Sequence, residues 1–234
     1  AQVAAGFLHT VLLRSNGTAI ACGNDEHGQC IIPPPEAGVT YAQVTAGEAH
    51  TVLLRSDGTA VACGYDDEGQ CNIPPLETGV TYAQVAGGGG HRVLLKSDGT
   101  AVACGDDEDG QCSIPSLEAG VTYAQVAAGC LHTVLLRSDG TAIACGNDEV
   151  GQCSIPSLEA GVTYAQVAAG ILHTVLLRSD GTAIACGSDE HGQCSIPPLE
   201  AGVTYAQVAA FERLSNNYRT LIEHLSKTCL THPS

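Results

Sequence analysis

The chain has 234 residues and a formal net charge of −16, because 25 Asp and Glu side chains stand against only 9 Lys and Arg. This charge repels the phosphates of nucleic acids and anionic lipid headgroups, so we expect neither nucleic-acid binding nor direct membrane insertion. Aromatic residues make up only 4% and Trp and Met are absent, which predicts a core of Val, Leu, Ile, Ala and Cys. The lack of Met even at position 1 indicates a processed chain or a piece of a longer one.

A 41-residue repeat organises most of the chain. The stretch "AQVAAGFLHT" at Ala1 returns with small changes at Ala42, Ala83, Ala124 and Ala165. The five tandem repeats span residues 1–41, 42–82, 83–123, 124–164 and 165–205. A sixth start, "AQVAA" at Ala206, gives way to a different sequence, so residues 206–234 hold a partial sixth repeat strand and a tail.

Each repeat is predicted to form four short strands, described here for the first repeat. "AQVAAG" leads through a tight turn to "HTVLLRS", and "NGT", which is "DGT" in the other four repeats, predicts a hairpin turn to "TAIACG". An acidic loop follows, and "QCIIP" is predicted as an outer strand because its Pro suits an edge. Such units predict an all-β, β-propeller-like array of five four-stranded blades. A solenoid is the alternative, although it does not favour a hairpin turn in every repeat.

The tail has the apolar spacing of an amphipathic helix. Its stripe consists of Phe211, Leu214, Tyr218, Leu221, Ile222 and Leu225. We expect a C-terminal helix that either caps the terminal blade or docks on a partner.

The stretch "VAAGFLHTVLLRSNGTAIACG", followed by "GQC", resembles the repeat of the regulator of chromosome condensation family. The resemblance covers residues 1–205 and implies a β-propeller of four-stranded blades. Propellers of that family usually close with seven blades, so five repeats imply an open or incomplete arc whose end strands are covered. Two departures stand out: Cys replaces the usual Trp before the second glycine, and no insertion projects from any repeat. Guanine-nucleotide exchange, which the family name suggests, is therefore the alternative function.

Two cysteines flank the acidic loop in every repeat, eight positions apart. The ten residues are Cys22 and Cys30, Cys63 and Cys71, Cys104 and Cys112, Cys145 and Cys153, and Cys186 and Cys194. If the flanking strands form a hairpin, each pair lies within bridging range, and a disulfide would stabilise by about 2.5 kcal/mol. Free thiols that fill the core are the alternative. Disulfides would imply a secreted or lumenal protein and thiols the cytosol or nucleus; Cys130 and Cys229 stay outside the pattern.

The repeats argue against catalytic and metal chemistry. His27 could join Cys22 and Cys30 as a zinc ligand, but Glu, Asp and Val take its place in the next three repeats. The histidine of each "GxxH" turn has no recurrent nucleophile beside it, so we predict a structural role for His9, His50, His91, His132 and His173. We expect no enzyme activity, metal or cofactor.

The two loops at one end of each blade vary between repeats, whereas the loops at the other end hardly change. Varying loops on a rigid scaffold commonly carry recognition, although drift would give the same pattern. The candidate partner-binding residues are Phe7, Leu8, Tyr65, Leu131, Ile171 and Leu172. We therefore expect a non-catalytic protein–protein interaction scaffold, or an accessory or structural subunit of a larger assembly.

Overall fold

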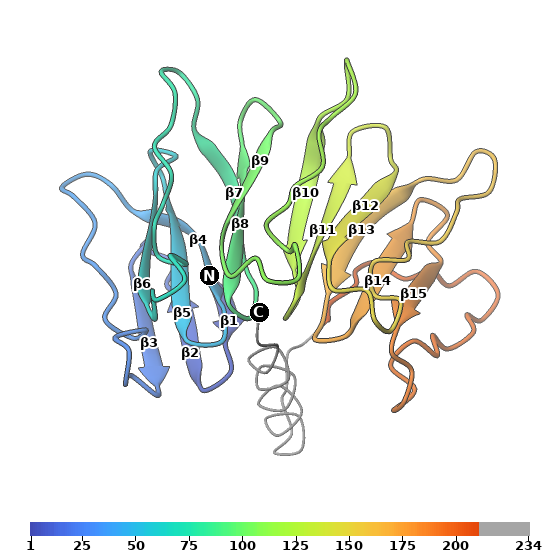
Figure 1. The fold of residues 1–234 in the computed structure, drawn as a ribbon, viewed down its shortest axis with the longest axis horizontal. Helices are drawn as coiled ribbons and strands as arrows, with labels where there is room; N and C mark the ends of the chain where they lie inside the picture. The colour runs from blue at the N-terminus through green and yellow to red at the C-terminus, as the bar shows by residue number, and fades with distance from the viewer. Residues whose placement is uncertain (211–234) are drawn as a thin grey trace, which may run out of the picture.

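The computed structural model of the protein describes residues 1–210, so the expected C-terminal helix lies outside the described residues. The described part holds fifteen strands in five antiparallel three-stranded sheets, which follow one another in chain order around a centre (Figure 1). The sheets are β1(Gln2–Ala5)-β2(His9–Leu13)-β3(Ala19–Gly23), β4(Tyr41–Ala46)-β5(His50–Arg55)-β6(Ala60–Gly64), β7(Tyr82–Gly87)-β8(His91–Lys96)-β9(Ala101–Gly105), β10(Tyr123–Ala128)-β11(His132–Arg137)-β12(Ala142–Gly146) and β13(Tyr164–Ala169)-β14(His173–Arg178)-β15(Ala183–Gly187). No helix in residues 1–210 is long and apolar enough to cross a membrane.

The predicted hairpin turn joins the second and third strands of each sheet. In the second sheet, Arg55 N donates to Thr59 O at 2.8 Å, and the Asp57 carboxylate accepts from Thr59 N at 2.9 Å. Gly58 takes a φ of +79°, which a side chain rarely adopts, and a Cβ there would lie 2.4 Å from Thr81 Cβ. The turn therefore requires the glycine of "DGT".

The sheets stack face to face, and the core lies between neighbours. Val11 and Leu13 of β2 pack against Tyr41 and Val44 of β4, and all four are buried. Because the sheets inside the array are covered on both faces, their middle strands are apolar on both sides. The first strands of all five sheets, with Ala210, line a central cavity of about 280 Å³.

A glutamine joins each first strand to the next. Gln43 Nε2 donates to Val85 O at 3.1 Å, and Val85 N donates to Gln43 Oε1 at 3.0 Å. Gln84, Gln125 and Gln166 repeat this two-bond clamp. The last clamp holds Val208, so the sixth start packs on the fifth sheet, although no strand is assigned there.

The predicted fourth strand does not form. In the first repeat, Cys30 N donates to the Asp25 side chain, Ile31 N to Gly28 O and Ile32 N to Cys30 O, and Pro33 has no N–H. Local turns thus use the donors that a strand would give to a ladder, and each sheet has three strands. Each first strand after β1 also begins at a tyrosine, one residue before the repeat boundary set from the sequence.

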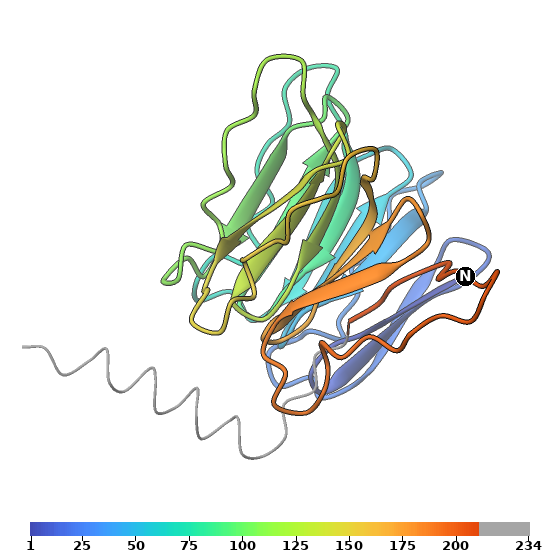
Figure 2. The same cartoon turned by 90° about the vertical axis from the view of Figure 1, so that its right-hand side faces the viewer.

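The two ends of the array differ from its middle. Val3 is 68% exposed, whereas Val44, its equivalent in the second sheet, is 1% exposed. Val208 at the other end is 8% exposed. Figure 2 shows the last described segment, in red, on the same side of the molecule as the blue first sheet. Among the described residues, the outer face of the first sheet therefore lacks the cover that the other sheets have.

Candidate functional site

Two loops of every sheet meet at the same end of the molecule. Asn24 N, just after β3, donates to Leu8 O in the turn between β1 and β2 at 2.7 Å, and the other four repeats make the same contact. We call this end the variable-loop face. It comprises the turns 7–8, 48–49, 89–90, 130–131 and 171–172 and the acidic loops 24–29, 65–70, 106–111, 147–152 and 188–193.

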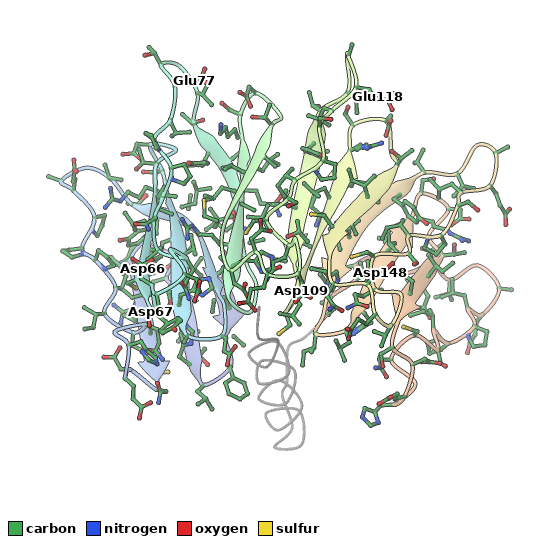
Figure 3. All side chains as sticks on the ribbon, in the orientation of Figure 1. Asp66, Asp67, Glu77, Asp109, Glu118 and Asp148 are labelled. Carbon is green, nitrogen blue, oxygen red and sulfur yellow. The ribbon has the colours of Figure 1, made fainter. Side chains whose placement is uncertain are left out.

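Acidic side chains dominate the variable-loop face. The variable-loop face carries more than half of the 25 acidic side chains and no Lys or Arg. Figure 3 labels four of its carboxylates, Asp66, Asp67, Asp109 and Asp148, which come from three different loops. The opposite end is less acidic, because its nine Asp and Glu side chains lie with five basic residues that precede the hairpin turns: Arg14, Arg55, Lys96, Arg137 and Arg178. The variable-loop face therefore has a negative potential that attracts cationic partners.

The acidic loops have a fixed conformation. The Asp25 carboxylate accepts a hydrogen bond from Cys30 N at 2.8 Å, and the Cys30 thiol donates to Asn24 O at 3.3 Å. Both bonds recur in the other four repeats. One carboxylate and one thiol of each loop thus hold the backbone in the same conformation in all five repeats.

A histidine, a threonine and a glutamine carbonyl lock neighbouring sheets together beneath the face. His9 Nε2 lies 2.9 Å from Thr51 Oγ1, and Thr51 donates to Gln29 O at 2.8 Å. Because the hydroxyl hydrogen is used on the carbonyl, Nε2 must carry a proton and donate it to Thr51 Oγ1. The same lock joins His91 to Thr133 and Gln111, and His132 to Thr174 and Gln152.

Burial keeps these imidazoles neutral. It lowers the pKa of His50 and of His91 to about 3 and that of His132 to about 4, and it also lowers the pKa of His9 and His173. The sequence predicted a structural role for this histidine, and its contacts in the structure are with neighbouring sheets rather than with a nucleophile.

The third sheet breaks the pattern, because Arg92 replaces the threonine of the lock. Its side chain is fully buried, and its guanidinium donates to Gly69 O and Asn72 O of the preceding repeat. His50 is the histidine that would contact a threonine at position 92. Its Nε2 has no hydrogen-bond partner, and neither has Arg92 Nε. Burial lowers the pKa of Arg92, which indicates a costly charge at this position.

A cavity of about 290 Å³ opens on the variable-loop face between the second and third sheets. It is lined by His27, Glu48, Ala49, Tyr65, Glu68, Gln70, Gly89, Gly90 and Asp106. Of the candidate partner-binding residues, only Tyr65 lines it. Leu8 is 57% exposed, and Phe7, Leu131, Ile171 and Leu172 are half-buried on the same face.

The eleven described cysteines are free thiols, so none of the five candidate pairs is bridged. The second cysteine of each pair lies in a turn, and the fourth strand that would have placed it opposite the first does not form. No group of three or more His, Cys, Asp or Glu in residues 1–210 is placed to hold a metal ion.

The Regulator of chromosome condensation (RCC1) repeat matches residues 1–29, 41–70, 123–152 and 164–193, just over half of the chain. The chain belongs to this family. The matched residues include the sheets and hairpin turns of the first, second, fourth and fifth repeats. The unmatched third repeat is the one with Arg92 and a run of four glycines.

Several solved structures share the fold of this chain. Prp20p from Saccharomyces cerevisiae has a TM-score of 0.72 at 20% identity, covering 84% of this chain and 59% of its own. Human WBSCR16 has a TM-score of 0.75 at 19% identity, covering 91% and 70%. The ectodomain of the Physcomitrella patens receptor kinase CR4 has a TM-score of 0.70 at 16% identity, covering 90% and 58%. The chain thus spans less than two thirds of the length of Prp20p. A comparison with curated protein sequences found no match.

The sequence analysis missed several side chains that build the RCC1-type array. They are the clamp glutamine of the first strand, the threonine of the lock and the loop carboxylate that accepts from the second cysteine. All three types recur in the repeats, which was the available signal. The partners of the glutamine and the threonine were not visible in the sequence, because each clamp and lock joins residues 42 positions apart in two different sheets.

We expect the cysteines to behave as poorly reactive thiols. Burial and nearby acidic groups raise the pKa of Cys112 and Cys153 to about 12, so little thiolate forms at neutral pH. Alkylation in denaturant without reductant, followed by intact mass, should modify all eleven described cysteines. In the folded protein, the exposed Cys22 should react before Cys112. An intact mass that lacks two adducts, or a multiple of two, would instead show that disulfides are present.

Proposed function

We propose that the protein is a non-catalytic interaction scaffold, and that it binds a protein partner through the variable-loop face. One observation carries the proposal: the loops that vary between repeats gather on one rigid, acidic end, whereas the turns that hardly change lie at the other. Loops that a rigid scaffold already holds in one conformation lose little conformational entropy when they bind a partner. Related proteins fit this role, since Prp20p has binding properties toward Gsp1p and histones and forms a complex with Kap60.

We expect apolar side chains to supply the contact area, with acidic side chains around them. Leu8 is largely exposed, and Ile171 and Leu172 form a second apolar patch on the fifth sheet. Apolar anchors inside a charged rim are typical of binding hot spots. The carboxylates around them would speed association with a basic partner and make it sensitive to salt.

Native co-purification followed by measurement of affinity tests the proposal. We expect the double variant Ile171→Ser and Leu172→Ser to bind the recovered partner at least about tenfold more weakly, as expected when hot-spot residues are lost. Val203→Ser is the matched control, because Val203 is 52% exposed but lies in a crossover outside the face. Equal affinity of the double variant and the wild type, with both folded, would refute this face.

Guanine-nucleotide exchange is the competing function. The scaffold proposal expects nucleotide release from a small GTPase to proceed at the same rate with and without the protein. If the protein accelerates nucleotide release and the variants of the variable-loop face abolish that acceleration, the protein is a regulatory factor rather than a scaffold.

A further inference from the structure

The outer face of the first sheet is built from residues whose equivalents are buried elsewhere in the array. Strand pairing places six side chains on this face: Val3 and Ala5 of β1, Thr10 and Leu12 of β2, and Ile20 and Cys22 of β3. Leu53, the equivalent of Leu12 in the second sheet, is fully buried in a cluster with Val11 of the first sheet. Leu12 itself is half-buried, and Ile20 is 39% exposed. A connected apolar face of this kind marks a docking surface.

The last described residue lies beside this face. Ala210 lines the central cavity together with Val3 and Ala5 of β1. Figure 2 shows the red segment that leads to Ala210 on the side of the blue first sheet. The residues that follow Ala210 therefore start within reach of the face and need to cross no other sheet to cover it.

Residues 211–225 carry an apolar stripe that matches such a face. The stripe consists of Phe211, Leu214, Tyr218, Leu221, Ile222 and Leu225. Wound as the helix that the sequence predicts, it extends about 21 Å from its first residue to its last. A five-residue strand such as β2 is about 17 Å long, so the stripe is long enough to cover the face.

Charge also favours this contact. Residues 211–234 carry three of the nine Lys and Arg of the chain but only two of its 25 Asp and Glu. This segment is therefore slightly basic, whereas the rest of the chain is strongly acidic. Asp25 and Glu26 follow β3 directly, so the first sheet presents negative charge next to its apolar face. The opposite charges of the two surfaces attract each other.

We propose that the outer face of the first sheet is the docking site of this chain's own residues 211–225. The stripe packs on Val3, Leu12 and Ile20 and takes the position that a neighbouring sheet takes in the rest of the array. Docking within one chain is favoured over docking of a second copy, because the direct connection to Ala210 keeps the segment at a high effective concentration near the face. The docked segment caps the array, as the terminal units of stacked repeat proteins require.

Hydrogen exchange of the full chain tests whether the segment covers the face. The double variant Leu221→Asp and Ile222→Asp places two charges in the stripe, and we expect residues 2–23 to exchange at least about tenfold faster than in the wild type. Residues 84–105, which form the third sheet, should keep their exchange rate. The matched control, Asn216→Asp with Thr220→Asp, adds the same charge on the opposite side of the predicted helix and should leave both rates unchanged.

Val3→Asp tests the face itself. Replacement of a solvent-exposed valine has little effect on stability, whereas a charge beneath the docked segment should lower the melting temperature by about 3 °C or more. Val203→Asp is the control, because Val203 is 52% exposed in a crossover, and its melting temperature should stay within about 1 °C of the wild type. In the Leu221 and Ile222 variant, Val3→Asp should lower the melting temperature no further.

Three outcomes would overturn the assignment: unchanged exchange of residues 2–23 in the Leu221 and Ile222 variant, an equal effect of its control, or an unchanged melting temperature in Val3→Asp. Protection of residues 2–23 that is lost on dilution, together with a dimer in sedimentation, would also overturn it, because the segment would then come from a second copy. None of these measurements involves the partner, so the interaction function is tested separately.

Discussion

Acidification from pH 7 to pH 4 should destabilise the folded protein by several kcal/mol. His50, His91 and His132 are buried and neutral, with pKa values of about 3 to 4 in the folded chain and about 6.5 when unfolded. Below pH 6.5 the unfolded chain takes up these protons and the folded chain does not, so stability falls as the pH drops toward 3 to 4. Each histidine contributes roughly 1 kcal/mol per pH unit within this window.

Urea unfolding at half-unit steps between pH 7 and pH 4 measures this dependence. The variant His132→Gln should be less stable at pH 7 but show a shallower loss on acidification, because it takes up one proton fewer. Protonation of surface carboxylates relieves repulsion in this acidic chain and opposes the loss, so raised salt should steepen it. Stability that is constant from pH 7 to pH 4, or an unchanged slope in the variant, would contradict the neutral histidine locks.

Arg92→Thr should stabilise the protein, although most substitutions of buried residues destabilise. The change removes a buried cation that has no carboxylate hydrogen-bonded to it. It also supplies a hydroxyl that can bond to His50 Nε2 and to Gln70 O. The lock seen for His9, Thr51 and Gln29 can then form between the second and third sheets as well. We expect a gain of about 1 to 3 kcal/mol, the range for satisfying a buried polar group.

The reverse substitution, Thr133→Arg, is the matched experiment. It breaks the lock of His91 and Gln111 and buries a charge, so we expect a loss of about 3 kcal/mol or more. Thermal unfolding of both variants beside the wild type measures the two shifts. A lower melting temperature for Arg92→Thr would show that the guanidinium stabilises this junction.

The 41-residue period was sufficient to predict the sheets, because alternating apolar strands and the "DGT" turn depend on neighbouring residues in the sequence. The fourth strand was predicted wrongly, since the apolar "QCIIP" resembles an edge strand, whereas the Asp25 carboxylate and local turns use its N–H groups. The variable-loop face followed from comparing repeats.

The cavity could not be predicted in this way. It depends on Tyr65 in one repeat, Gly90 in the next and His27 in the one before, and only the stacking of the sheets brings these residues together.

Hydrogen exchange of the protein alone and with its co-purified partner tests the central claim most directly. Binding through the variable-loop face should slow exchange in residues 48–49, 65–70 and 171–172 and leave the hairpin turns around Gly58, Gly99 and Gly140 unchanged. Protection confined to those hairpin turns, with none in the variable loops, would contradict the account.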